Sequence, residues 1–176
     1  MAVSARRSHP TRELLLDAAL ALGADRPLSA IPVDDIVREA GVAKGTFYVH
    51  FADRGAFMVE LHARFEREMR RAIATAVGGM APGRDRLLAG ARAGLDSCGA
   101  QSATKSLLLE SRADPSIANA IARRNQAFAQ DSADDFVALG VADPEVAARL
   151  FVAVVAEAAL LEMELGHADE RVRAAL

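Results

Sequence analysis

Hydrophobic residues recur every three or four positions along nearly the whole chain, which is the spacing of α-helices that bury one face. The first such segment runs from Thr11 to Gly23, and the second is VDDIVREA, residues 33–40. The second is expected to end at Gly41, where the chain must turn left-handed after a helix. Two helices separated by a loop are therefore predicted before residue 41.

A short third helix and a long fourth helix follow. The stretch GVAKGTFYVHF, residues 41–51, contains two glycines and is too short to be a stable helix alone. Phe47 and Phe51 are one turn apart, so both are expected to pack against the first and fourth helices. Asp53 is a good N-cap for a helix that ends near Val77.

The rest of the chain also has helical signals. DPSIANA and DPEVAAR share one start signal, an Asp N-cap followed by Pro at the first helical position. A short helical tail follows Asp169. The longer helices are predicted at about residues 84–98, 101–112, 115–139 and 144–165. With no convincing strand pattern, we predict an all-α fold.

The composition supports this fold class and adds a charge asymmetry. Hydrophobic residues make up 52% of the 176 residues and aromatic residues 5%, which favours helices over strands. The net charge is -3, but residues 1–71 hold 11 Lys and Arg against 10 Asp and Glu, and the remainder holds 10 against 14. This is compatible with a small DNA-contacting module joined to a larger acidic domain.

Several function classes are disfavoured. Cys98 is the single cysteine, so no intrachain disulfide forms, and we expect a cytoplasmic protein. No apolar run approaches the roughly 20 residues of a membrane span. The histidines are scattered, and His62 with Glu66, four residues on, is the kind of pair commonly found on a surface. Without a phosphate loop or nucleophile elbow, we expect no enzyme, no cofactor and no metal site.

The second and third predicted helices, joined by a glycine-containing turn, have the pattern of a helix-turn-helix. Gly45, Thr46 and Val49 lie opposite the two phenylalanines, on a face that suits the major groove of DNA. Gly45 lets the backbone come close, Thr46 can donate to a phosphate or base edge, and Val49 suits a thymine methyl. Lys44 can reach guanine acceptors or phosphate.

Tyr48 and His50 flank this face, and Arg54 lies at the start of the next predicted helix. Tyr48 and His50 can bond phosphates on either side, which fixes register without reading sequence. Arg54 adds positive charge at a helix N-terminus, where an anion is already favoured. An ordinary packed helix pair is the alternative, and it leaves these polar flanks unexplained. The predicted DNA-binding set is Ala43, Lys44, Gly45, Thr46, Tyr48, Val49, His50 and Arg54.

Residues 11–65, and above all EAGVAKGTFYVHFADRGAF, resemble the N-terminal DNA-binding domain of the TetR family of bacterial repressors. The resemblance implies DNA contact at Lys44, Gly45, Thr46, Tyr48 and His50, and phosphate contact at Arg54, where the family often has Lys. Two positions depart from the family pattern. Pro32 stands where Ser or Thr often caps the second helix, and Gly55 stands where Glu is frequent.

The resemblance also implies an organisation and a function. Residues 1–52 would form the helix-turn-helix domain, extending into the fourth helix, and residues 53–176 a helical regulatory and dimerisation domain. The protein would be a repressor that a small, hydrophobic effector releases from a palindromic double-stranded DNA operator. The alternative is a helical regulator or adaptor without such a ligand, controlled by a protein partner or by oxidation of Cys98.

The helix at 144–165 is apolar on two stripes, whereas a surface helix needs only one. It is either a buried central helix or pairs with a second copy. The resemblance favours a homodimer, because these repressors dimerise through their last two long helices. The stripe predicted to face the partner is Val152, Val155, Ala156, Ala159, Leu160 and Met163, and the other is Phe151, Val154, Ala158, Leu161 and Leu165. The middle helices would enclose the effector, with candidate lining residues Phe65, Leu95, Leu107, Glu110 and Phe128.

Overall fold

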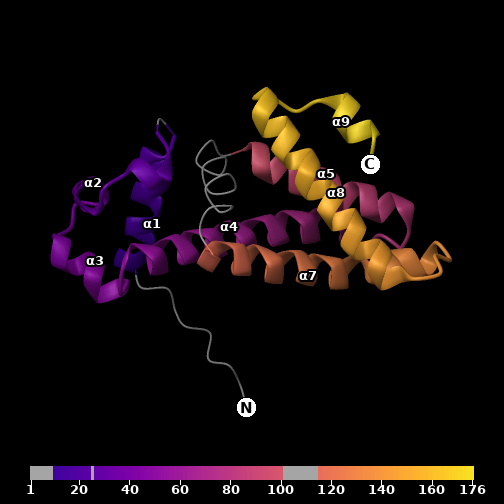
Figure 1. The fold of residues 1–176 in the computed structure, drawn as a ribbon, viewed down its shortest axis with the longest axis horizontal. Coiled ribbons are helices and arrows are strands. Elements are labelled where there is room, and N and C mark those ends of the chain that lie inside the picture. The colour runs from indigo at the N-terminus through magenta and orange to yellow at the C-terminus, as the bar shows by residue number, and fades with distance from the viewer. Residues whose placement is uncertain (1–9, 25, 101–114) are drawn as a thin grey trace, which may run out of the picture.

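In a computed structural model that describes residues 10–24, 26–100 and 115–176, the chain is built from helices (Figure 1). One end holds α1 (Pro10–Leu22), the 3-10 turn η1 (Leu28–Ala30), α2 (Val33–Glu39) and α3 (Lys44–His50). The remainder holds α4 (Arg54–Val77), α5 (Arg84–Gly99), α7 (Pro115–Ala138), α8 (Pro144–Leu165) and α9 (Glu170–Ala174). No strand occurs in the described residues, and the predicted all-α fold is confirmed.

Local signals set the helix limits. The Asp53 side chain accepts a hydrogen bond from the Ala56 backbone N–H at 2.8 Å, which caps α4 as predicted. Asp143 caps α8 in the same way, accepting from Val146 N–H at 3.1 Å. Gly41 turns the chain after α2 with φ of 67°. The helix predicted at 101–112 lies outside the described residues.

A cluster of phenylalanines holds α3 in place. The Phe47 and Phe51 side chains are 0% and 3% exposed, and their ring centroids lie 5.3 Å apart. Phe57 of α4 lies 5.2 Å from Phe47 and 4.9 Å from Phe51, also centroid to centroid. Burial of these three rings supplies the stability that so short a helix lacks by itself.

α4 is shared between the two parts of the molecule. Its 24 residues extend about 36 Å at 1.5 Å per residue. In Figure 1 it runs from the α2–α3 end to the helices of the C-terminal part, with α7 along its side. Arg70 of α4 and Asp131 of α7 form an ion pair at 2.6 Å between these two helices. α5 and α8 complete the C-terminal bundle.

Candidate DNA-binding surface and ligand cavity

The face of α3 opposite its phenylalanines is open to solvent. Val49 is 80% exposed and Tyr48 51% exposed. Gly45 is exposed, and a Cβ added there would meet no atom within 4 Å, so packing within the chain does not require glycine. Glycine inside a helix costs about 1 kcal/mol relative to alanine. Without a side chain at this position, the backbone of α3 is open to close approach from outside.

Two aromatic side chains on this helix rest against buried rings. The Tyr48 ring contacts the edge of Phe47 with centroids 5.3 Å apart, and the His50 ring lies 6.5 Å from Phe51. Tyr48 is therefore held on one flank of the helix while its other side faces solvent. Thr46 and His50 are half-buried, and Ala43 is exposed at the N-cap position of α3.

Lys44 at the start of α3 is engaged by a neighbouring helix. Its Nζ lies 2.8 Å from one carboxylate oxygen of Asp34 on α2 and 3.0 Å from the other. Both side chains are more than half exposed. The hydrogen bond from Lys44 to Asp34 raises the pKa of Lys44 from its ordinary value, so the ammonium stays charged.

Arg54 has an internal role that the sequence did not predict. Its two terminal nitrogens donate hydrogen bonds to the backbone carbonyls of Leu28 and Ile31. These carbonyls belong to η1 and to the residue that follows it, and the Leu28 carbonyl also accepts a hydrogen bond from the Ile31 backbone N–H. The guanidinium thus ties the start of α4 to the loop between α1 and α2, which positions the helix-turn-helix on α4.

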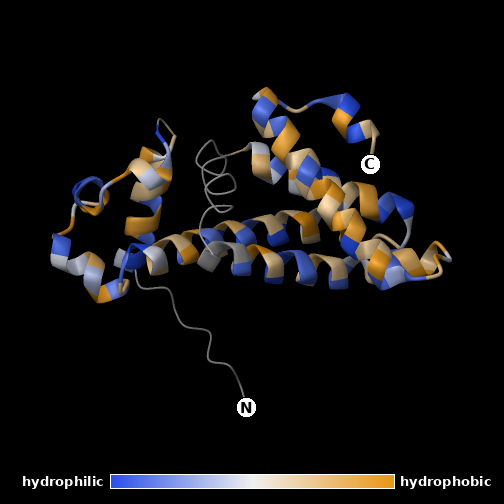
Figure 2. Ribbon diagram, in the orientation of Figure 1, coloured by the Kyte–Doolittle hydropathy of each residue, from blue (hydrophilic) through white to orange (hydrophobic). Residues whose placement is uncertain are grey.

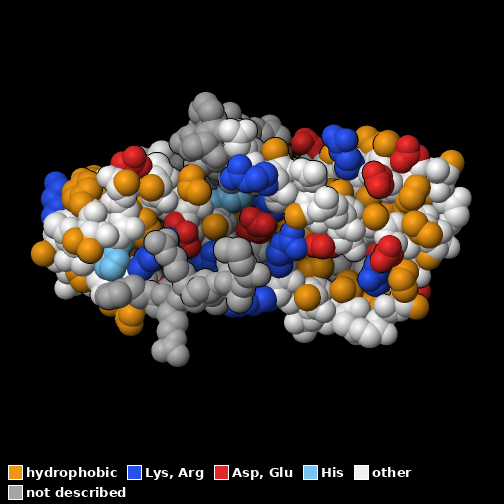
Figure 3. Space-filling view, turned by 90° about the horizontal axis from the view of Figure 1, so that it is seen from below, with side chains coloured by type: hydrophobic (Ala, Val, Ile, Leu, Met, Phe, Trp, Pro, Cys, Tyr) orange, Lys and Arg blue, Asp and Glu red, His pale blue; other side chains and the backbone are white. Residues whose placement is uncertain are grey.

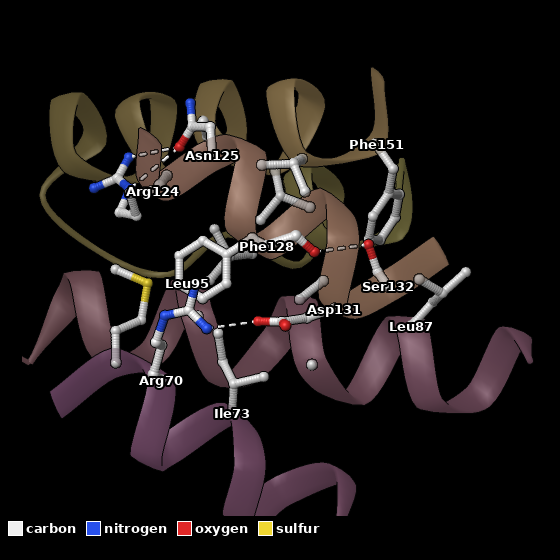
Figure 4. A pocket seen from close by; sticks show the side chains of 18 of the residues that line it. Arg70, Ile73, Leu87, Leu95, Arg124, Asn125, Phe128, Asp131, Ser132 and Phe151 are labelled. Carbon is white, nitrogen blue, oxygen red and sulfur yellow. Dashed lines mark hydrogen bonds and ion pairs between the residues drawn. The ribbon is translucent and has the colours of Figure 1, made fainter. Parts of the chain in front are cut away.

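The C-terminal part contains a partly open cavity of about 630 Å³. Side chains of α4, α5, α7 and α8 line it, and most of them are apolar, among them Ile73, Leu87, Leu95, Phe128 and Phe151 (Figure 4). A largely apolar cavity of this size with a few polar groups is typical of small-molecule sites.

The predicted pocket residues are only partly at this cavity. Leu95 of α5 and Phe128 of α7 line it. Phe65 is 4% exposed and belongs to the hydrophobic core, but it is not among the lining residues. Leu107 and Glu110 lie outside the described residues.

The choice of faces on α8 needs a correction. The stripe predicted to face a second copy faces the interior of the chain. Met163 is buried in the core. The other five members line the cavity: Val152, Val155, Ala156, Ala159 and Leu160. The large exposed apolar residues of α8 include three from the other stripe: Val154, Leu161 and Leu165. Both stripes are apolar, so periodicity alone did not identify which one packs inward.

Sequence reasoning missed two buried polar side chains near the cavity, Arg124 and His62. Arg124 is 6% exposed, and His62 is 1% exposed rather than a surface residue paired with Glu66. Burial, with a contribution from Arg124, lowers the pKa of His62 to about 4, so its ring is neutral at pH 7. Ile121, Arg124 and Phe128 lie on one face of the helix. A charged residue on an otherwise apolar face was the sequence signal that could have indicated a buried arginine.

Cys98 lines the cavity and is 8% exposed. Burial raises the pKa of its thiol to about 11, which leaves it protonated at neutral pH. Because the thiolate is the form that reacts with oxidants, this environment makes Cys98 a poor redox sensor. Within the described ranges, no group of three or more His, Cys, Asp or Glu side chains could hold a metal ion. No helix in these ranges is long and apolar enough to cross a membrane.

Comparisons with known proteins agree with this arrangement. Residues 15–61 match the model of bacterial regulatory proteins, tetR family. The chain is 40% identical over 63 residues to the HTH-type transcriptional regulator YwcC of Bacillus subtilis, a match that covers 36% of this chain and 27% of that protein. The chain therefore spans about a quarter of the length of this curated relative.

Solved structures match over nearly the full chain. A TetR-like transcriptional regulator from Rhodococcus sp. RHA1 superposes with a TM-score of 0.74 at 18% identity, covering 97% of this chain and 93% of that one. The multidrug binding protein EbrR, complexed with imidazole, gives 0.76 at 20% identity, covering 96% and 93%. At these identities the likeness concerns the fold, and the match over residues 15–61 carries the assignment. Residues 15–61 are therefore similar to bacterial regulatory proteins of the tetR family, and the curated relative that shares this region is an HTH-type transcriptional regulator.

Proposed function

We propose that the protein is a repressor that binds a palindromic operator as a homodimer and leaves it when a small effector occupies the C-terminal cavity. The observation that carries this proposal is the pairing of two features in one chain. α3 offers an exposed face that packing does not explain, and α4 connects that helix directly to the walls of a 630 Å³ cavity.

The DNA contacts are assigned to the exposed face and its flanks. Gly45 and Val49 approach the bases, and Lys44, Thr46, Tyr48 and His50 bond phosphates or base edges. A two-fold dimer would place two copies of α3 about one DNA turn, roughly 34 Å, apart. Arg54 contributes charge at this surface while its nitrogens hold the carbonyls of Leu28 and Ile31.

The dimer contact is assigned to the outward face of α8 and the adjoining end of α7. Figure 2 shows α8 coloured hydrophobic along most of its length. Figure 3 shows hydrophobic side chains gathered at the end of the molecule where α7 meets α8. Contiguous exposed apolar surface of this kind marks an interaction site. The residues are Val137, Leu139, Val141, Val146, Leu150, Val154, Leu161 and Leu165.

The effector acts by shifting a population of conformers. Met69, Arg70 and Ile73 of α4 line the cavity, and the same helix begins at the Arg54 contacts with η1. A ligand that prefers a tilted α4 would therefore move the two recognition helices out of operator spacing. A ligand can shift the equilibrium only by the difference in its affinity for the two conformers.

The test uses the purified full chain and DNA from the region upstream of its own and the adjacent gene. We expect a protein–DNA complex by gel shift, with two protomers per site by analytical ultracentrifugation. Leu150→Glu should yield a monomer with at least tenfold weaker operator binding. Leu14→Glu, which places the same charge on an exposed leucine of α1, should leave the oligomeric state unchanged. A chain that binds no such DNA would overturn the proposal.

A further inference from the structure

Six charged side chains line the cavity; four of them form two ion pairs, and the other two are Arg124, which is buried, and Glu157, which is exposed. Arg70 lies 2.6 Å from Asp131, and Arg86 Nε donates to Asp135 at 2.6 Å. Asp135 also accepts a hydrogen bond from the Gly83 backbone N–H at 2.9 Å. These pairs leave no net charge on the part of the wall that they form.

Arg124 differs from the other lining arginines. Its Nε and Nη2 both donate to one neutral acceptor, Asn125 Oδ1, at 3.2 and 3.1 Å. Nη1 is buried and has no hydrogen-bond partner in the part of the chain that the structure describes. No ion pair to Arg124 is recorded there, and Glu66 acts on it only through space. A guanidinium stays protonated in proteins, so a full positive charge is buried beside the cavity.

The neighbours of Arg124 do not supply the missing negative charge. Cys98 and His62, which feel its field, are both neutral at pH 7, and the Glu66 carboxylate acts on Arg124 only through space, without an ion pair. A buried cation without a counterion is strongly unfavourable, and it persists where a ligand supplies the anion. Figure 4 shows Arg124 and Asn125 at one end of the cavity and Leu87 and Phe151 at the other. The cavity is thus cationic at one end and lined by large apolar side chains beyond it.

We propose that the cavity binds a small organic monocarboxylate with an apolar body, and that the guanidinium of Arg124, at one end of the cavity, receives its carboxylate. A single unpaired cation matches a singly charged head group rather than a dianion. The apolar body lies over Leu95 and Phe128, toward Phe151. This inference rests on the proposed function in treating the cavity as the effector site.

The test compares probes that share a skeleton and differ in the head group. Octanoate, 1-octanol and octylamine form one set, and 4-phenylbutanoate with its alcohol and amine forms a second, so that body shape is varied independently. Binding to the full chain is measured by isothermal titration calorimetry. A charge-assisted hydrogen bond predicts that the carboxylate of at least one set binds about tenfold or more tightly than its alcohol, and that the amines do not bind.

Variants then locate the head group. Arg124→Met should abolish the preference for carboxylate over alcohol, and Arg124→Lys should retain part of it, because lysine keeps the charge and loses the planar fork. Arg123→Gln removes the same charge from the exposed neighbouring position and should leave all affinities unchanged. The proposal is overturned if carboxylate and alcohol bind alike, if Arg124→Met keeps the preference, or if no probe of either set binds.

The DNA assay separates this inference from the proposed function. The same preparation is titrated with operator DNA in the absence of probe. If the chain binds operator DNA but binds no probe, or binds carboxylate and alcohol equally well, the carboxylate proposal is overturned and the proposed DNA-binding function is not. If the chain binds carboxylates selectively but does not bind DNA, the repressor proposal is overturned and the proposed carboxylate site is not.

Discussion

Lys44 of the recognition helix is held by Asp34 of α2, with 2.8 Å between the ammonium nitrogen and a carboxylate oxygen. In the free chain, the first basic side chain of the predicted DNA-binding set is therefore already paired with a negative charge. DNA phosphates must compete with this carboxylate for Lys44. An exposed pair of this kind contributes only about 0–1 kcal/mol, so the competition is one that DNA can win.

Removing this competition should strengthen DNA binding. Asp34→Asn is expected to raise operator affinity by up to about fivefold and to steepen the dependence of log K on log salt by up to about one unit, since one more cation is free to neutralise a phosphate. Fluorescence anisotropy at several salt concentrations measures both quantities. The control is Glu39→Gln, which removes an exposed carboxylate from the same helix. Equal effects of the two variants would refute a specific role for the Asp34–Lys44 pair.

Tyr48 and Val49 should separate affinity from specificity. Tyr48→Phe keeps the ring against Phe47 and removes only the hydroxyl, so it should weaken binding to all operator variants alike, as loss of a phosphate contact does. Val49→Ala should instead change the preferred base at one position, with about 1 kcal/mol less discrimination for thymine. Binding selection from a randomised operator reads out both. A change of base preference caused by Tyr48→Phe would contradict the assignment of its hydroxyl to the phosphates.

Arg54 should prove to be a structural residue as well as a source of charge. Arg54→Lys retains one positive charge but cannot donate to the Leu28 and Ile31 carbonyls together. We expect the free energy of unfolding to fall by about 1–2 kcal/mol, because hydrogen bonds from charged donors have about this value. Urea denaturation followed by circular dichroism measures it. A role limited to phosphate binding would show unchanged stability and weaker operator binding, which is the opposite outcome.

Mild acid should destabilise the chain through His62. Its pKa is about 4 in the folded chain and close to 6.5 when unfolded, so below pH 6.5 the unfolded chain binds a proton that the folded chain does not. The free energy of unfolding therefore decreases as pH falls, by about 2 kcal/mol between pH 7 and pH 5. His62→Leu should remove this part of the pH dependence in denaturant titrations at the two pH values.

The matched control for His62 is His167, which is exposed. His167→Gln should leave the difference in unfolding free energy between pH 7 and pH 5 as it is in the unaltered chain. If His62→Leu and His167→Gln had the same effect, burial of His62 would not be the cause of acid sensitivity.

Local features of the sequence predicted much of the fold. Asp53 and Asp143 were recognisable as caps and Gly41 as a left-handed turn, because each depends on residues within a few positions. The exposed face of α3 was also predictable, since Phe47 and Phe51 fix the buried face of so short a helix. These predictions needed only helical periodicity and the chemistry of one residue type at a time.

Features that depend on distant partners were not predictable from one sequence. Arg54 looked like a phosphate ligand because nothing local indicates that the carbonyls of Leu28 and Ile31 face it. The two stripes of α8 are equally apolar, and only the packing of α5 and α7 decides which one lines the cavity. Arg124 was detectable in principle, as a charge between Ile121 and Phe128 on an apolar stripe, but its missing counterion is a property of the assembled walls.

The packing of the Phe57 ring against Phe47 and Phe51 has a consequence for modularity. Although the chain pattern suggests a boundary at residue 52, the core beneath the recognition helix is completed by a ring that enters from α4. A recombination event that exchanged regulatory halves at that boundary would separate these rings and leave the short helix unsupported. Junctions placed further along, beyond Leu61, keep the aromatic triad within one parent. Chimaeric proteins that join this helix-turn-helix to another regulatory domain should therefore have their junction inside α4 rather than at its start.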